Sequence, residues 1–152
     1  MTKEQLKQIK KEVEEFFEKT TFEVEVEVLP ENEKTVPIRI NAQDPQVLIG
    51  EGGQTLSEIQ HLLKSILKKK IQEEFYINLD INGYKEKKED YLREMVRSIA
   101  DEVILTKRER ELPPMPSYER RIVHMELSTR EGVEAESVGE EPERRVVVRP
   151  KP

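Results

Sequence analysis

Three of the chain's six glycines fall within four residues, Gly50-Glu51-Gly52-Gly53, and this cluster separates two helical patterns. Before it, Asp44-Pro45 predicts the start of a short helical turn that ends at Ile49. After it, apolar residues recur at helical spacing from Leu56 to Leu67 and predict a longer amphipathic helix. Glycine allows backbone conformations and close approaches that other residues do not. We therefore expect two helices joined by a tight glycine turn.

Runs of alternating apolar and polar residues lie on both sides of this helical segment. The runs 22–28 and 36–40 predict a hairpin, and the run 77–81 predicts a third strand. Pro37 has no N–H to donate, so it is expected near the start of its strand or with its nitrogen facing away from the partner strand. An amphipathic helix over about residues 3–19 precedes the strands.

The pair Asn82-Gly83 is typical of a turn and predicts the boundary between two small domains, 1–83 and 84–152. A helical pattern then runs from about residue 84 to 108. It cannot continue through Leu112-Pro113-Pro114-Met115-Pro116, because proline lacks the N–H of a helical hydrogen bond.

The last part of the chain predicts one more helix and a hairpin. Ser117 is expected to cap a helix over residues 118–127. The runs 133–138 and 144–149 flank the turn Gly139-Glu140-Glu141-Pro142 and predict two antiparallel strands. The sequence thus predicts an α+β protein in which the second domain carries a short antiparallel sheet.

The composition excludes several kinds of site. The chain has no cysteine, and its two histidines, His61 and His124, make a structural zinc site improbable. No stretch near the N-terminus approaches the roughly 20 apolar residues of a membrane span. We expect a soluble, cytoplasmic protein that needs no cofactor.

The charge is unevenly distributed along the chain. The formal net charge of −6 argues against a generic basic protein that coats nucleic acid, because such binding comes from neutralising phosphates. Ten of the eleven arginines, however, lie after residue 83. The planar fork of arginine suits phosphates and its face suits bases. Any binding of polyanions is therefore expected from local patches, mainly in the second half.

The glycine turn carries a resemblance to a known family. Its segment, Ile49-Gly50-Glu51-Gly52-Gly53-Gln54-Thr55-Leu56-Ser57-Glu58-Ile59, follows the pattern I-G-x-x-G-x-x-L-x-x-I. With its order of helices and strands, αββααβ, the first half resembles a type II KH domain. The resemblance implies a clamp on single-stranded nucleic acid about four nucleotides long, formed by Gly50, Glu51, Gly52, Gly53 and Gln54. A turn that only connects two helices is the alternative.

One residue departs from the KH pattern. KH loops commonly have lysine or arginine at the two central positions, where this chain has Glu51 and Gly52. A solvated carboxylate ~4 Å from a phosphate is repelled by about 1 kcal/mol. The loop is therefore expected to bind nucleic acid weakly, or to serve a protein partner instead.

The second candidate site is the pair Arg120 and His124, which are four residues apart and therefore share one helical face. Arginine can fork to a phosphate, and histidine can donate a hydrogen bond or stack on a base. The ordinary alternative is a histidine that is simply packed or capped. A third possibility is an enzyme in which the pair cleaves phosphodiesters, but no further catalytic group accompanies it.

The surroundings of this pair resemble the R-three-H domain of the bacterial Jag family, in which a KH domain precedes R-three-H. The segments that carry the resemblance are 116–127 and 138–148. It implies binding of single-stranded nucleic acid through the Arg/His helix, helped by Arg121, Arg144 and Arg145. The alternative for the last two is a solvated strand face, paired with Glu140, Glu141 or Glu143. Jag relatives often carry an additional N-terminal domain, whose roles are not carried over to these residues.

Together these features predict a cytoplasmic RNA-binding protein without catalytic activity, acting as a post-transcriptional regulator or RNA chaperone. Two modules on one strand would bind more tightly than either alone. These residues do not distinguish RNA from single-stranded DNA, which is therefore a second candidate ligand. The alternative function is a protein-interaction adaptor, in which the KH half pairs with a small KH protein or with a second copy of this chain.

Overall fold

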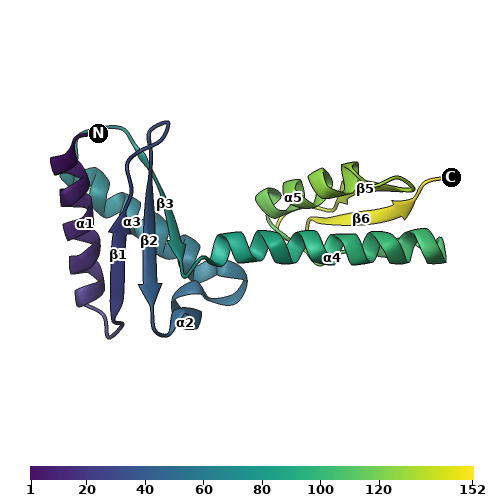
Figure 1. Cartoon of the computed structure of the whole chain (residues 1–152), viewed down its shortest axis with the longest axis horizontal. Coiled ribbons are helices and arrows are strands. Elements are labelled where there is room, and N and C mark those ends of the chain that lie inside the picture. Colours follow the sequence, from purple (N-terminus) through teal and green to yellow (C-terminus); the bar gives the residue numbers. More distant parts are fainter. The chain divides into compact units, whose positions relative to one another are not determined.

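The computed structural model describes all 152 residues, and the chain divides into two compact units, Met1–Lys85 and Glu86–Pro152. Each unit combines helices with a three-stranded sheet (Figure 1). The structure is therefore a mixed α+β protein with short sheets, as the periodicity of the sequence predicts. No helix in it is both long and apolar enough to cross a lipid bilayer.

The first unit contains helices on one face of its sheet. Its elements, in order, are α1 (Lys3–Glu18), β1 (Val24–Val28), β2 (Thr35–Ala42), α2 (Pro45–Ile49), a 3₁₀ turn (Glu51–Gly53), α3 (Gln54–Lys70) and β3 (Tyr76–Ile81). Strand β2 lies in the centre, antiparallel to β1 and parallel to β3. The parallel pairing arises because the helical segment between β2 and β3 returns the chain to the same end of the sheet.

Local sequence explains where these elements begin and end. Thr2 caps α1 through a capping box with Gln5, which satisfies two backbone N–H groups at the start of the helix. Pro37 is the third residue of β2 and lies beside the end of the β1–β2 ladder, whose last pair is Val28 with Ile38. Pro37 also pairs with Asn78 of β3, but its carbonyl oxygen accepts from the N–H of Leu29, just beyond β1. Its nitrogen therefore faces that side, and the β2–β3 ladder loses no hydrogen bond.

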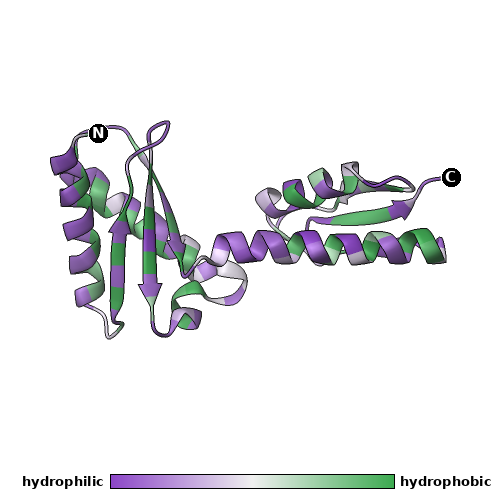
Figure 2. Ribbon diagram, viewed as in Figure 1, coloured by the Kyte–Doolittle hydropathy of each residue, from purple (hydrophilic) through white to green (hydrophobic).

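The core of the first unit lies between the sheet and the inner faces of its helices. Phe17 of α1, Ile38 of β2, Leu63 of α3 and Leu79 of β3 are all almost fully buried. Figure 2 shows the same alternation, with apolar segments of the helices facing the strands and polar segments facing outward. This packing holds the start of α3, and with it the glycine turn, in place.

The second unit is built on one long helix. Its elements are α4 (Tyr84–Thr106, whose first two residues belong to the first unit), β4 (Arg110–Glu111), α5 (Ser117–Ser128), β5 (Val133–Val138) and β6 (Arg145–Pro150). The sheet is antiparallel in the order β4-β6-β5. Its core joins Val96 of α4, Val123 of α5 and Val148 of β6.

Two details of the second unit differ from what the sequence predicts. Pro116, not Ser117, is the N-cap of α5, and no side chain caps this helix. Pro116 has an extended backbone, and α5 begins directly after it, one residue earlier than expected, so Ser117 is the first helical residue. Strand β4 is not predicted, because two residues are too few for a periodic pattern and its pairing with β6 bridges more than 30 residues.

Candidate functional site

The imidazole of His124 faces strand β5. Its Nε2 lies 2.8 Å from the hydroxyl oxygen of Ser137, within hydrogen-bond distance. Burial lowers the pKa of His124 below its ordinary value of 6.5, and the positive charge of Arg120 lowers that pKa further. The ring is therefore neutral at pH 7, so it both donates and accepts hydrogen bonds.

Arg120 lies one turn before His124 and is buried. Its Nη2 donates a hydrogen bond to Oε1 of Glu141 at 2.9 Å, while its Nε and Nη1 are buried without any hydrogen-bond partner. A buried cation with unpaired donors is costly, so the guanidinium depends strongly on its one carboxylate. The structure thus encloses Arg120 between α5 and the β5–β6 turn, whereas the sequence suggested an exposed fork.

The other predicted arginines lie in different surroundings. Arg144 Nη1 donates to the carbonyl oxygen of Gly139 at 2.7 Å and so holds the same turn that Glu141 ties to Arg120. Arg121 is exposed and forms no ion pair. Arg145 pairs with Glu111 of β4, with its Nε 3.3 Å from Oε2. Its carboxylate partner is therefore on β4 and is none of the glutamates of the turn.

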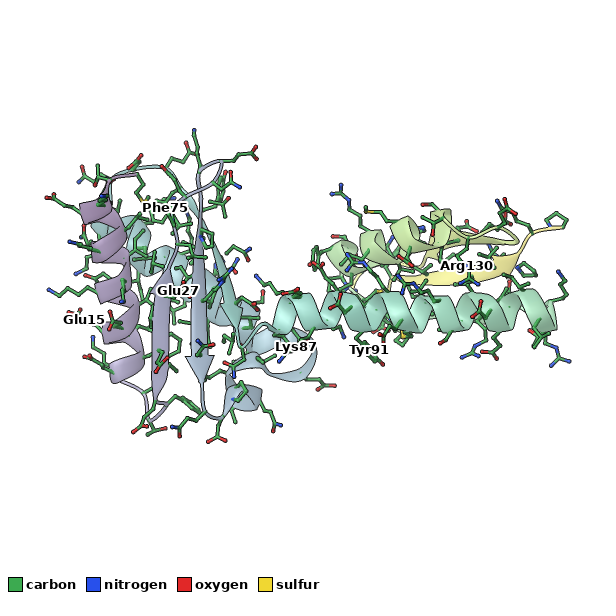
Figure 3. All side chains as sticks on the ribbon, viewed as in Figure 1. Glu15, Glu27, Phe75, Lys87, Tyr91 and Arg130 are labelled. Atoms are coloured by element: carbon green, nitrogen blue, oxygen red, sulfur yellow. The ribbon has the colours of Figure 1, made fainter.

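Most arginines of the second half already have carboxylate partners within the chain. Arg108, Arg121 and Arg144 are the arginines after residue 83 that form no ion pair. The paired ones are Arg93, Arg97, Arg110, Arg120, Arg130, Arg145 and Arg149. Arg130, labelled in Figure 3, pairs with Asp101 in this way. The number of arginines therefore overstates the free positive charge of this unit.

The glycine turn of the first unit has two positions where only glycine fits. Gly50 has a φ of 74°, and a Cβ there would lie 2.2 Å from the hydroxyl oxygen of Thr55. Gly53 has a φ of 82°, and its Cβ would lie 2.9 Å from the ring of Tyr84. Both positions combine a left-handed backbone with a close approach, so a larger residue would be strained at either one.

The remaining predicted residues of the turn are close to solvent. Glu51 and Gly52 are exposed, and the side chain of Gln54 donates to Glu58 at 3.3 Å on the outer face of α3. The turn therefore presents a carboxylate, and no cation, at its tip. It lies in the first unit, whereas Arg120 and His124 lie in the second.

The sequence does not predict that Tyr84 and Lys85 contact residues of the first unit. Tyr84 packs its ring against Gly53, and the ammonium of Lys85 lies 2.6 Å from Oδ1 of Asn78 and 3.3 Å from Oε1 of Gln60. Burial lowers the pKa of Lys85, although Asp80 opposes the shift. Because Tyr84 and Lys85 directly follow Asn82-Gly83, the sequence places them in the second domain, and no local pattern indicates that they contact the first.

Comparison with known proteins gives a domain family for the second unit and relatives that cover most of the chain. Residues 90–150 match the R-three-H domain family. The RNA-binding protein KhpB of Clostridium symbiosum is 34% identical over 137 residues, which cover 90% of this chain and 62% of that protein. KhpB of Bacillus subtilis is 32% identical over 120 residues (78% and 58%), and KhpB of Streptococcus pneumoniae is 31% identical over 117 residues (77% and 36%). The chain spans less than two thirds of the length of each relative.

Proposed function

Because this chain belongs to the Jag family, whose KhpB relatives carry the name RNA-binding protein, we propose that it binds single-stranded RNA. The observation that carries the proposal is the cluster of Arg120, His124 and Arg144 around the β5–β6 turn. We assign to this cluster most of the binding energy. Acting as a post-transcriptional regulator or an RNA chaperone is the cellular role that fits such binding.

The two units take different parts in the proposal. The first is a type II KH-like domain that ends at the Asn82-Gly83 turn, and the second is the R-three-H domain that begins with α4. Support for the KH assignment comes from the element order αββααβ, the parallel pair β2–β3 and the left-handed glycines before α3. The first turn of α4 packs back onto the glycine turn through Tyr84.

The glycine turn contributes less to RNA binding in this proposal. The free N–H groups at the start of α3 attract a phosphate, but the carboxylate of Glu51 repels it. The KH-like half therefore adds a weak second contact, which raises affinity because it is tethered to the first.

In this proposal, the R-three-H half binds RNA through hydrogen bonds and through a local positive charge. Arg121 and Arg144 have no carboxylate partner, so each is available to a phosphate without first breaking an ion pair. His124 offers a neutral ring beside them, suited to a base or to a phosphate oxygen. No chemical step is assigned to this surface, and RNA kept with the protein is expected to stay intact.

The experiment that tests the proposal measures RNA affinity by fluorescence anisotropy with a labelled single-stranded oligonucleotide. The double variant Arg120→Ala with His124→Ala is expected to lose about tenfold or more in affinity. Its matched control, Arg108→Ala with His61→Ala, removes the same two residue types from exposed positions elsewhere and is expected to stay within about twofold. Equal affinities of the two double variants, each shown to be folded by thermal unfolding, would contradict the proposal.

A second candidate function is a protein-interaction adaptor. Val47 of α2 and Leu62 of α3 are 64% and 49% exposed, so these helices of the first unit present apolar side chains that a partner would cover. The partner proposed for this surface is a small single-KH protein or a second copy of this chain. Sedimentation velocity of the full chain, alone and mixed with such a protein, should detect a complex that Leu62→Glu weakens. Unchanged sedimentation in both cases would exclude this adaptor role.

A further inference from the structure

Arg120 and Glu141 form an ion pair of unequal partners. The side chain of Arg120 is 9% exposed, whereas that of Glu141 is 59% exposed. One contact joins them, from Nη2 of the arginine to Oε1 of the glutamate at 2.9 Å. The other two guanidinium nitrogens have no partner in the folded chain. The arginine is therefore held by packing, while the glutamate is held mainly by this one contact.

Breaking the ion pair costs the two side chains different amounts of free energy. Glu141 can rotate into water and be solvated there with little loss, as exposed carboxylates are. Arg120 cannot follow, and without an anion it becomes a buried charge with three unsatisfied nitrogens. The guanidinium thus needs an acceptor beside Nη2, and an anion satisfies it best. The structure does not require that this anion be Glu141.

The oxygen atoms of a carboxylate and of a phosphodiester are equivalent acceptors for a guanidinium. The surroundings of Arg120 also favour a ligand, because His124 lies one turn away and Arg144 carries no carboxylate. We propose that Glu141 occupies the place of an RNA phosphate on Arg120, and that RNA binds by displacing it. This inference rests on the proposed function, and it makes Glu141 a residue that sets the affinity of the site.

The β5–β6 turn is suited to such an exchange. Arg144 holds the carbonyl oxygen of Gly139, and the N–H of Glu143 donates to the carbonyl oxygen of Glu140 at 2.8 Å. Neither bond involves the side chain of Glu141. The turn therefore keeps its own hydrogen bonds when the carboxylate leaves Arg120, so displacement need not unfold the hairpin.

The test compares two neighbouring glutamates of the same turn. In Glu141→Gln the amide oxygen can still accept from Arg120, but the competing charge is gone, so RNA affinity is expected to rise about threefold to tenfold at low salt. Glu140→Gln removes the same charge one residue away, where no ion pair is present, and is expected to change affinity by less than about twofold. Equal gains in the two variants would mean a general effect of charge. A loss in Glu141→Gln would mean that the carboxylate supports the site. Either result would overturn the exchange.

A second measurement does not depend on the stability of a variant. In the wild-type chain, the NMR signal of the Arg120 Nε–H group is expected to shift when RNA is added, because its guanidinium changes partner. An unmoved signal in RNA-saturated protein would overturn the exchange. If Arg120→Ala with His124→Ala abolishes binding while Glu141→Gln equals Glu140→Gln, only the exchange fails. If the wild-type chain binds no RNA, the proposed function fails and the exchange fails with it.

Discussion

His124 and Ser137 join the middle of α5 to strand β5 through a contact of 2.8 Å between Nε2 and the hydroxyl oxygen. The two residues are 13 positions apart, and neither is fully buried. The hydroxyl fixes the orientation of the ring before any ligand arrives, which lowers the entropy that binding has to remove. Ser137 therefore belongs to the proposed binding surface, although it carries no charge.

Replacement of this serine should weaken RNA binding without unfolding the protein. Ser137→Ala leaves the ring of His124 free to rotate, and a lost hydrogen bond of about 1 kcal/mol corresponds to roughly a fivefold loss in affinity. Ser128→Ala is the matched control, because the Ser128 hydroxyl bonds only to a carbonyl of its own helix. Anisotropy titrations of the two variants check the prediction, which fails if both bind like the wild type.

Stability should depend on pH through His124. Burial and the charge of Arg120 lower the pKa of this ring in the folded protein, whereas the unfolded ring titrates near 6.5. Below that pH the unfolded chain binds a proton that the folded chain does not, so the free energy of unfolding falls as the pH falls. Urea unfolding at pH 7.5 and 5.5 measures this decrease. The free energy of unfolding should fall less in His124→Gln than in the wild type. An identical decrease in both proteins would mean that His124 does not cause the pH dependence of stability.

RNA affinity should change with pH in the opposite direction. A phosphate near His124 favours the protonated ring, so binding takes up a proton and tightens as the pH is lowered from 7.5 to 6. His124→Gln should remove this gain, and His61→Gln, which changes an exposed histidine of α3, should keep it. Titrations of the three proteins at both pH values provide the comparison, and a gain retained in His124→Gln would be the contrary result.

Gly53 should tolerate substitution less well than Gly52. Both have a positive φ, but a Cβ on Gly53 meets the ring of Tyr84 at 2.9 Å, whereas nothing lies within 4 Å of one on Gly52. Gly52→Ala should destabilise the protein by about 1 kcal/mol and Gly53→Ala by about 2–3 kcal/mol. In a Tyr84→Ala background the difference between the two should shrink. Thermal unfolding measures all four variants, and equal losses at the two glycines would refute the contact.

Glu51 should oppose RNA binding at the glycine turn. Glu51→Lys replaces repulsion by attraction and is expected to raise affinity at low salt by about fivefold, with a smaller gain at high salt. The control Glu25→Lys makes the same change on the exposed face of β1, the strand at the other edge of the sheet from β3. Equal affinities of the two variants would indicate that the turn does not lie near phosphates.

The sequence predicts those features of the fold that depend on residues close to one another along the chain. Helix α1 spans Lys3–Glu18 where periodicity predicts about 3–19, and β6 spans Arg145–Pro150 where it predicts 144–149. These patterns are visible because neighbouring residues determine them. The spacing of Arg120 and His124 on one helical face is predictable in the same way.

The partners of the site residues are not predictable in this way. Glu141 lies 21 residues from Arg120, and Glu111 lies 34 residues from Arg145. Sequence alone does not indicate which of many glutamates will pair with an arginine, because the pairing depends on how the helix and the hairpin pack. For the same reason, the many arginines after residue 83 predict a free basic surface. In the structure, most of them form ion pairs within the second unit.

The proposed function requires that RNA lie against α5 and the β5–β6 turn. Photocrosslinking of the wild-type chain to a single-stranded RNA that contains 4-thiouridine, followed by mass spectrometry of the linked peptides, tests this claim directly. We predict crosslinks within residues 117–128 and 137–145, with fewer at residues 50–54. Crosslinks confined to the first unit, Met1–Lys85, would contradict binding at α5 and the β5–β6 turn.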